Sequence, residues 1–176
     1  KDMTLYWWFA NSLSDINMQV WKETRFHLSQ IIMWLKNSFI YSPSQLYHRI
    51  YEPCMVGWKQ GETHYQNRTF SAYSELWTLD LKTFADHLDV WYQKRDNTSK
   101  YIHPTQKPVQ LAERALKRSS EKDDIVLDAF GGSGSTMIAC EQLGRRARLI
   151  ELDGKYVDAI VGRWVQYSGD AAVIKN

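Results

Sequence analysis

Residues 125–143 read IVLDAFGGSGSTMIACEQL, and this order of residues decides the fold. A short apolar run at 125–127 leads into a glycine-rich stretch, and an apolar run of helical character follows. Strand, glycine-rich turn and helix in this order are typical of an α/β unit. Because glycine has no Cβ and tolerates positive φ, the turn would let a ligand approach the bare backbone. The N–H groups at the start of the helix would then face that ligand.

The spacing of the glycines narrows the class of ligand. A phosphate-binding loop requires G-x-x-x-x-G-K-[ST], but no lysine occurs in residues 131–135. The dinucleotide pattern G-x-G-x-x-G does not fit Gly131, Gly132 and Gly134. Asp128, at the end of the strand, would repel a pyrophosphate and attract an ammonium group. These features favour a ligand with an amino-acid end and a nucleoside end, which is the chemistry of S-adenosylmethionine (SAM).

A second strand pattern, RLIELD at residues 148–153, ends in acidic residues. In nucleotide-binding α/β units, an acid at the end of the second strand accepts hydrogen bonds from ribose hydroxyls. Glu151 follows Asp128 by 23 residues, close to the roughly 20 that this geometry needs. On these two strands alone, an ordinary α/β turn with a solvated acid stays open as the alternative.

The segment upstream carries a family resemblance. Residues 103–108 read HPTQKP and precede a helix-like run at 109–117. HPTQKP, a helix and then D-x-F-x-G-S-G closely resemble the permuted, beta-class-like DNA amino-methyltransferases, which methylate adenine N6 or cytosine N4. Within that family the sequence is most similar to the phage- and ParB-associated branch. The resemblance continues to residue 169, and it persists more loosely through the segments at 32–38 and 51–61.

The resemblance implies a fold and a function. The expected fold class is α/β, a Rossmann-like SAM-dependent methyltransferase fold with a mostly parallel sheet and helices on both faces, present here whole or in part. We expect one domain over residues 1–176, with a target-recognition-like insertion at about 60–102 and a SAM-binding part at 103–169. The implied reaction transfers a methyl group from SAM to an exocyclic amine of a DNA base, with adenine N6 favoured by the branch. DNA is the implied partner.

The resemblance also assigns residues to the cofactor S-adenosylmethionine. Asp128 and the backbone of the glycine turn are assigned to the methionine end, and Glu151 to the ribose. The HPTQKP segment is expected to close the pocket, with His103 as a structural hydrogen-bonding residue. The full set of cofactor-binding candidates is Asp128, Phe130, Gly131, Gly132, Ser133, Gly134, Ser135, Thr105, Gln106, Lys107 and Glu151. No catalytic residue is assigned, and no metal is expected.

The acceptor motif of the family, [D/N/S]-P-P-[Y/F], does not occur in the sequence. Its four prolines, at positions 43, 53, 104 and 108, are never adjacent. Three explanations stay open. The sequence is part of a longer enzyme, or one piece of a split methylase whose second chain carries the motif. Alternatively, it is a degenerate methylase that binds SAM or DNA without chemistry. A homodimer partner also stays open, as a partner separate from that second chain.

Composition sets looser bounds on function. The sequence is 44% hydrophobic and carries a net charge of +2, which permits DNA binding but does not argue for it. Cys54 and Cys140 suggest neither a zinc site nor a disulfide framework. No apolar run is long enough to cross a bilayer, so we expect no membrane partner and a cytoplasmic location in a bacterial or phage-infected cell.

Periodicity predicts the elements. Strands are expected at 3–9, 29–36, 51–58, 71–77, 125–127 and 147–152, and helices at 14–27, 109–118, 134–143 and 154–167, with a loop at 37–49. Four aromatic residues in polar surroundings, Tyr65, Tyr73, Trp91 and Tyr92, are candidates for base stacking, with core packing as the default alternative.

Overall fold

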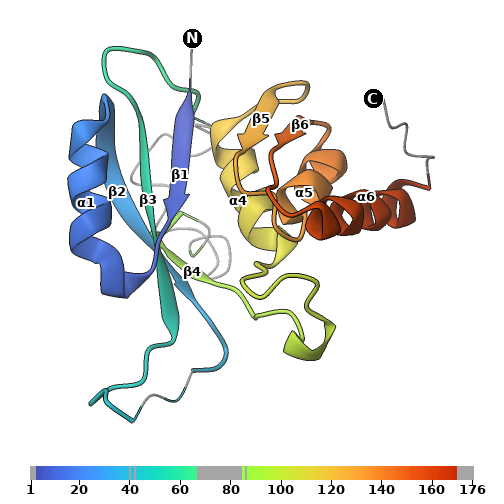
Figure 1. Cartoon of the computed structure of the whole chain (residues 1–176). Helices are drawn as coiled ribbons and strands as arrows, with labels where there is room; N and C mark the ends of the chain where they lie inside the picture. The colour runs from blue at the N-terminus through green and yellow to red at the C-terminus, as the bar shows by residue number, and fades with distance from the viewer. Residues whose placement is uncertain (1–2, 40, 42, 67–84, 86, 170–176) are drawn as a thin grey trace. The chain divides into compact units, whose positions relative to one another are not determined.

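The computed structural model describes residues 3–39, 41, 43–66, 85 and 87–169 (Figure 1). The expected strand at 71–77 and the stacking candidate Tyr73 lie outside these residues. The chain divides into two compact units, residues 1–94 and residues 95–176.

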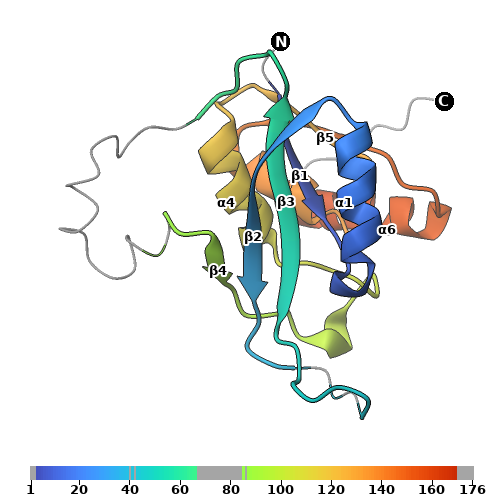
Figure 2. The same cartoon turned by 90° about the vertical axis from the view of Figure 1, so that its left-hand side faces the viewer.

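The first unit is built on a four-stranded sheet with the order β1-β3-β2-β4 (Figure 2). Its strands are β1 (Thr4–Trp8), β2 (Phe26–Leu35), β3 (Tyr51–Lys59) and β4 (Val90–Tyr92). Strand β3 runs antiparallel to both β1 and β2, whereas β2 and β4 are parallel. The predicted α/β class is confirmed, but this sheet is mixed and its longest pairings are antiparallel.

Helix α1 (Ser14–Glu23) packs on the sheet through Trp21, which is buried. At Gly57 of β3, an added Cβ would lie 1.9 Å from the carbonyl oxygen of His27 and 2.8 Å from the Trp21 ring. Only glycine fits between the neighbouring strand and the helix at this position. A register shift between Leu28 and Gln30 interrupts the pairing close to the same contact.

The predicted helix at 14–27 is too long. Helix α1 ends at Glu23, where the Thr24 hydroxyl donates to the Trp21 carbonyl oxygen (2.6 Å) and accepts the Phe26 N–H (3.2 Å). Strand β2 therefore begins at Phe26, earlier than residue 29. The physical reason is the long-range pairing of Phe26 with Lys59, which local periodicity does not report.

Aromatic side chains form the core of the first unit. Trp34 is buried, and the Trp8 ring lies 6.2 Å from it and 6.4 Å from Trp91, in edge-on arrangements. Trp91 is only 5% exposed, so its assignment as a base-stacking candidate is wrong; it is a core residue. Its neighbour Tyr92 points to the other face of the sheet and is 69% exposed.

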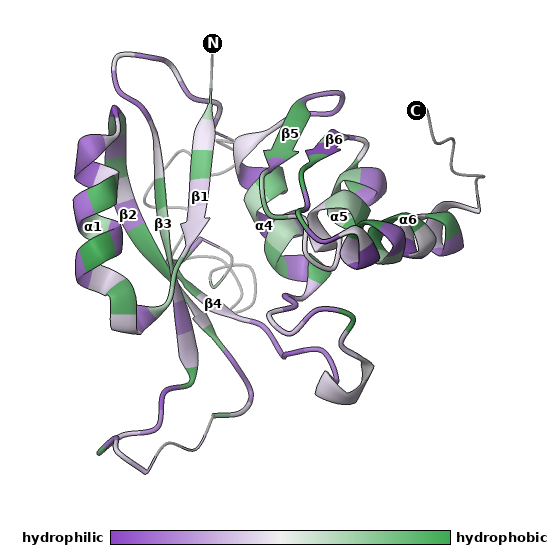
Figure 3. Ribbon diagram, viewed as in Figure 1, coloured by the Kyte–Doolittle hydropathy of each residue, from purple (hydrophilic) through white to green (hydrophobic). Residues whose placement is uncertain are grey.

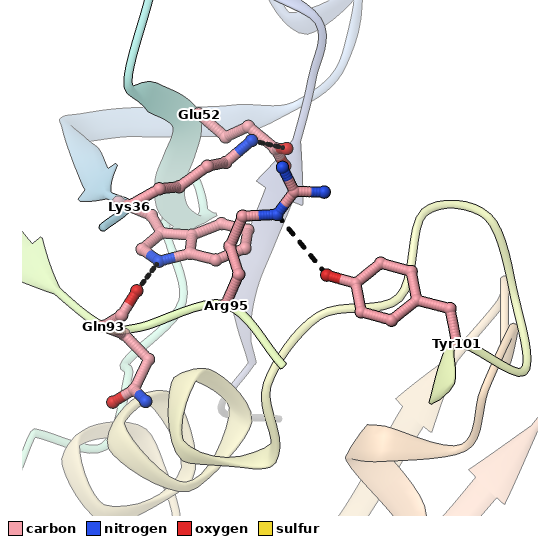
Figure 4. A network of polar contacts seen from close by, with 6 residues as sticks. Lys36, Glu52, Gln93, Arg95 and Tyr101 are labelled. Carbon is pink, nitrogen blue, oxygen red and sulfur yellow. Dashed lines mark hydrogen bonds and ion pairs between the residues drawn. The ribbon is translucent and has the colours of Figure 1, made fainter. Parts of the chain in front are cut away.

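Polar contacts fix the carboxyl ends of β2 and β4 (Figure 4). The Trp34 Nε1–H donates to the carbonyl oxygen of Gln93 (2.7 Å), and the Gln93 N–H donates to that of Leu35 (3.0 Å). Lys36 forms an ion pair with Glu52 and lies over the Trp34 ring. The carboxyl end of β2 is thereby fixed by contacts with β3 on one side and with the residue after β4 on the other.

The second unit alternates helices and strands as predicted. Its elements are η2 (Thr98–Lys100), α4 (Val109–Ser119), β5 (Ile125–Asp128), α5 (Ser135–Leu143), β6 (Arg146–Leu149) and α6 (Gly154–Ser168). Strands β5 and β6 are parallel, with Asp128 paired with Leu149. Helices α5 and α6 end at Gly144 and Gly169, both in the left-handed conformation that favours glycine.

The core of the second unit lies between α4, α5 and one face of the strand pair. Leu116, Ala139 and Cys140 are buried there, with Val126 and Ala147 packed against them. Burial raises the pKa of the Cys140 thiol to about 11, so it is inert at neutral pH. Strand β5, which is hydrophobic along most of its length (Figure 3), turns Ile125 to the other face, where it is exposed. Among the residues described, no helix is both long and apolar enough to span a membrane.

Candidate cofactor-binding site

The site begins where β5 ends. Asp128 uses both oxygens of its carboxylate within the turn: Oδ1 accepts the Phe130 N–H (3.0 Å), and Oδ2 accepts the Thr136 hydroxyl (2.6 Å). The carboxylate therefore ties the start of the glycine turn to the first turn of α5. Such charge-assisted hydrogen bonds are stronger than neutral ones.

Glu151 reaches the same turn from the end of β6. Its Oε2 accepts the Gly132 N–H (2.7 Å), while Oε1 accepts the N–H groups of Leu152 (2.9 Å) and Asp153 (3.1 Å). The hydrogen bond from the Asp153 amide, followed by that from Gly132, lowers the pKa of the Glu151 carboxyl. The parallel pairing of β5 and β6 thus brings the two predicted acidic residues onto one turn.

The glycines of the turn allow helix α6 to pack closely on it, in addition to leaving the backbone open to a ligand. A Cβ at Gly131 would lie 3.0 Å from the Ile160 side chain of α6, and one at Gly134 would lie 3.1 Å from it. Gly134 also has φ = 76°, and Gly132 has φ = 55°. At Gly132 an added Cβ would meet only ordinary contacts, with the His103 ring nearest at 3.7 Å. The close approach of α6 is therefore a second reason for the glycines, and it cannot be read from the spacing of the glycines in the sequence.

The HPTQKP segment at 103–108, predicted to close the pocket, has residues with two kinds of contact. Thr105 and Gln106 contact residues before Lys107, whereas His103 and Lys107 contact the glycine turn. The Thr105 N–H donates to Nδ1 of His103 (3.2 Å), and the Gln106 side chain donates to Asp96 (2.8 Å) and accepts the Ile102 N–H (3.1 Å). The Thr105 hydroxyl also lies 3.1 Å from Nδ1 of His103, so the side chains of Thr105 and Gln106 are both engaged within the residues that precede Lys107.

Lys107 and His103 make the contacts with the glycine turn. The backbone carbonyl of Lys107 accepts the Ser135 hydroxyl (2.6 Å), and the Ser135 and Ser133 hydroxyls lie 3.2 Å apart. The His103 ring lies beside Gly132 and packs on Tyr156, with 4.4 Å between ring centroids. The structure therefore brings the whole set from Asp128 to Ser135 together with Glu151, His103 and the Lys107 backbone.

Helix α6 contributes residues to which the sequence analysis assigned no role. Nη1 of Arg163 donates to the Ser133 carbonyl oxygen (2.9 Å), and burial lowers the pKa of this guanidinium. Tyr156, Ile160 and Arg163 follow one another at intervals of four and three residues, which places them on one face of the helix. This spacing in the sequence is enough to predict that the three side chains share one face of the helix.

The start of α5 has no side-chain cap. Its N-cap is Gly134, which offers no side chain to the first N–H groups, and its first turn holds no acidic residue. An uncapped helix start presents amide donors and a partial positive charge to an acceptor. Next to the two carboxylates, Phe130 and Leu152 are largely exposed, so apolar surface adjoins the polar groups. Among the residues that the structure describes, no three histidine, cysteine or acidic side chains gather in a way that could hold a metal ion.

Truncation of Ile160 tests the packing of α6 on the turn. Ile160→Ala should lower the free energy of unfolding by about 2–4 kcal/mol, because it opens a cavity against Gly131 and Gly134. Denaturant unfolding followed by circular dichroism measures this loss. Val157→Ala on the same helix removes an exposed side chain and is the control. A loss as small as that of the control would contradict the packing argument.

Acid titration tests the Glu151 contacts. Because folding lowers the pKa of this carboxyl, its stabilising contribution is present above the unfolded pKa and is lost as pH falls through the folded value. The difference in unfolding free energy between the parent protein and Glu151→Gln should therefore shrink as pH drops from about 6 to about 3. Glu121→Gln, at an exposed position, is the control. A difference that does not change with pH would mean that the carboxylate contacts do not stabilise the fold.

Comparison with known proteins shows to which family the chain is related. A family model described as DNA methylase, N6_N4_Mtase, matches residues 3–162. The Type II methyltransferase M.HinfI of Haemophilus influenzae is 36% identical over 83 residues, which are 47% of this chain and 21% of that protein. M1.MboII of Moraxella bovis is 31% identical over 100 residues, or 57% of this chain and 36% of that protein. The chain thus spans a fifth to about a third of these relatives' length.

Solved structures show the same fold. A crystal structure of the M1.HpyAVI–SAM complex matches with a TM-score of 0.73 at 22% identity, covering 93% of this chain and 74% of that one. A putative DNA modification methylase from Thermus thermophilus, complexed with SAM, matches with a TM-score of 0.66 at 25% identity, covering 94% and 70%. The predicted Rossmann-like methyltransferase fold is confirmed. Since the family model covers nearly all of the 176 residues, the chain belongs to the N6/N4 DNA methylase family.

Proposed function

We propose that the protein is a SAM-dependent DNA methyltransferase that methylates an exocyclic base amine, and that this chain supplies its cofactor-binding unit. The observation that carries the proposal is the meeting of Asp128 and Glu151 on one glycine turn at the uncapped start of α5. Two carboxylates and a helix start together match a ligand with ammonium, carboxylate and ribose groups.

The proposed contacts of the cofactor follow from these groups. Asp128 would take the ammonium, the first N–H groups of α5 the carboxylate, and Glu151 the ribose hydroxyls. Both carboxylates already accept backbone or hydroxyl donors, but an ionised carboxylate has about four acceptor positions, so further donors can be accommodated. Phe130 and Leu152 offer exposed apolar surface for a purine ring.

The residues of the site would act by binding and orientation. When bound, SAM would supply a methyl group on a sulfonium, an electrophile suited to an amine acceptor. The turn and α5 would hold the cofactor in one orientation, which is a gain in proximity for transfer. Adenine N6 is the proposed target, and DNA is the proposed partner.

A second candidate function is a methylase-like protein that binds SAM or DNA without transfer. The separation of all four prolines favours it for this chain, because the acceptor turn needs two adjacent prolines. If the protein is an enzyme that uses this turn, the turn is supplied by a further part of the polypeptide or by a second chain of different sequence.

Substitution of Asp128 tests the cofactor site. Asp128→Asn should weaken SAM binding about 10- to 100-fold, because a charge-assisted hydrogen bond is worth about 1.5–3 kcal/mol. Isothermal calorimetry measures the affinity, and circular dichroism reports the fold, because the same carboxylate also ties Phe130 to Thr136. Asp158→Asn on the exposed face of α6 is the control. Unchanged affinity would remove Asp128 from the site.

Transfer of radiolabelled methyl groups from SAM to unmethylated DNA tests whether this chain catalyses methylation. Incorporation by the purified chain would establish the enzyme and would show that an acceptor site is present without adjacent prolines. SAM binding without incorporation would favour the cofactor-binding part or the non-catalytic relative. Where label is incorporated, acid hydrolysis of the labelled DNA would identify the methylated base as adenine or cytosine.

A further inference from the structure

A cavity lies in the first unit, at the end of the sheet where β2 and β3 are joined. The structure gives it a volume of about 360 Å³, within the range of pockets that take small organic ligands. Its lining comes from the segment at 45–51 and from Asn11 near the start of α1. None of these residues belongs to the proposed cofactor site.

The lining has a distinct chemistry. It combines two amides, two phenols, an imidazole and a guanidinium, contributed by Asn11, Gln45, Tyr47, Tyr51, His48 and Arg49. Among the described residues, none that lines the cavity carries a carboxylate, and residues 37–50 of the sequence contain no aspartate or glutamate. A neutral or anionic ligand is therefore favoured over a cation.

The walls of the cavity are held in place. The Lys36 N–H donates to the Ile50 carbonyl oxygen (2.8 Å), which extends the β2–β3 pairing and closes the connection at its base. His48 stacks on Phe39, with 4.9 Å between centroids and 7° between planes, and lies 5.1 Å from the Tyr41 ring. The Tyr51 hydroxyl contacts Asn11 Oδ1 at 3.4 Å across the cavity lining.

Exposed aromatic rings accompany this cavity. Tyr47 is 89% exposed, and Tyr41 is 69% exposed. Tyr92, 69% exposed, stands opposite Leu35 at the end of β2, where the connection begins. Because these tyrosines are exposed, they do not contribute to the buried core. Their flat rings are available for stacking by unpaired bases.

We propose that the segment at 45–51 binds an unstacked nucleotide of single-stranded DNA. Tyr47 stacks on the base, the amides of Asn11 and Gln45 hydrogen-bond its edge, and Arg49 contacts the adjoining phosphate. The proposal rests on the proposed function, in which DNA is the substrate, since an amino-methyltransferase needs its target base outside the duplex. A free nucleotide has the same chemistry, and the experiment below separates the two sources.

The test uses a fluorescein-labelled single-stranded oligodeoxynucleotide and fluorescence anisotropy. Tyr47→Ala should weaken its binding about 5- to 100-fold, the range expected for loss of one base–aromatic stack. Arg49→Gln should weaken it and reduce the slope of log affinity against log salt by about 0.7, because one phosphate contact is lost. Tyr167→Ala, at a half-exposed tyrosine of α6, is the matched control and should change neither quantity.

Calorimetry with SAM on the same preparations keeps this proposal separate from the proposed function. Weaker oligonucleotide binding with unchanged SAM affinity supports the nucleotide site. Unchanged oligonucleotide affinity in both variants overturns it, as does an equal loss in Tyr167→Ala. Binding of free dAMP that depends on Tyr47, without binding of the oligonucleotide, overturns the DNA source. Failure of the parent protein to bind SAM would contradict the proposed function and would leave the oligonucleotide result to be judged by itself.

Discussion

The candidate cofactor site depends on two carboxylates that hold one glycine turn. Asp128 binds the turn at its beginning and Glu151 binds it in the middle, and both act through hydrogen bonds to backbone N–H groups or a neighbouring hydroxyl. Parallel pairing of β5 and β6 makes this possible, because it brings the carboxyl ends of both strands to the same edge. Without either strand, the turn would lose one of these two anchors.

The second constraint on the turn comes from α6. Ile160 packs so closely on Gly131 and Gly134 that a Cβ at either position would lie 3.0–3.1 Å from it and would require the isoleucine to shift. Arg163 binds the Ser133 carbonyl from the same helix face. A glycine-rich motif therefore carries two demands at once. It must let a ligand approach one side of the backbone and a helix approach the other, and only Gly132 is clear of the helix.

The sequence predicted the second unit better than the first. In residues 109–169 the signals that end an element are local in the sequence: glycines follow α5 and α6, and apolar runs separate the turns. The predicted boundaries of these helices and strands therefore lie within a few residues of the observed ones. In the first unit the decisive interactions are long-range. The pairing of Phe26 with Lys59 ends the helical pattern. The partners Tyr6 and Trp8 place Trp91 in the core, although the wider stretch of sequence around it is rich in polar and charged residues. The polar contacts of Thr105 and Gln106 within their own loop also have no sequence signal.

The engagement of Asp128 and Glu151 bears on how such a site binds its ligand. Carboxylates that already accept two or three hydrogen bonds have few rotamers left, so little ordering entropy remains to be lost on binding. The backbone donors also keep Glu151 ionised, as the direction of its pKa shift indicates. Remaining lone pairs are therefore fixed in direction before a ligand arrives. On this argument the hydrogen bonds within the turn support binding, because folding rather than the ligand orients the acceptors.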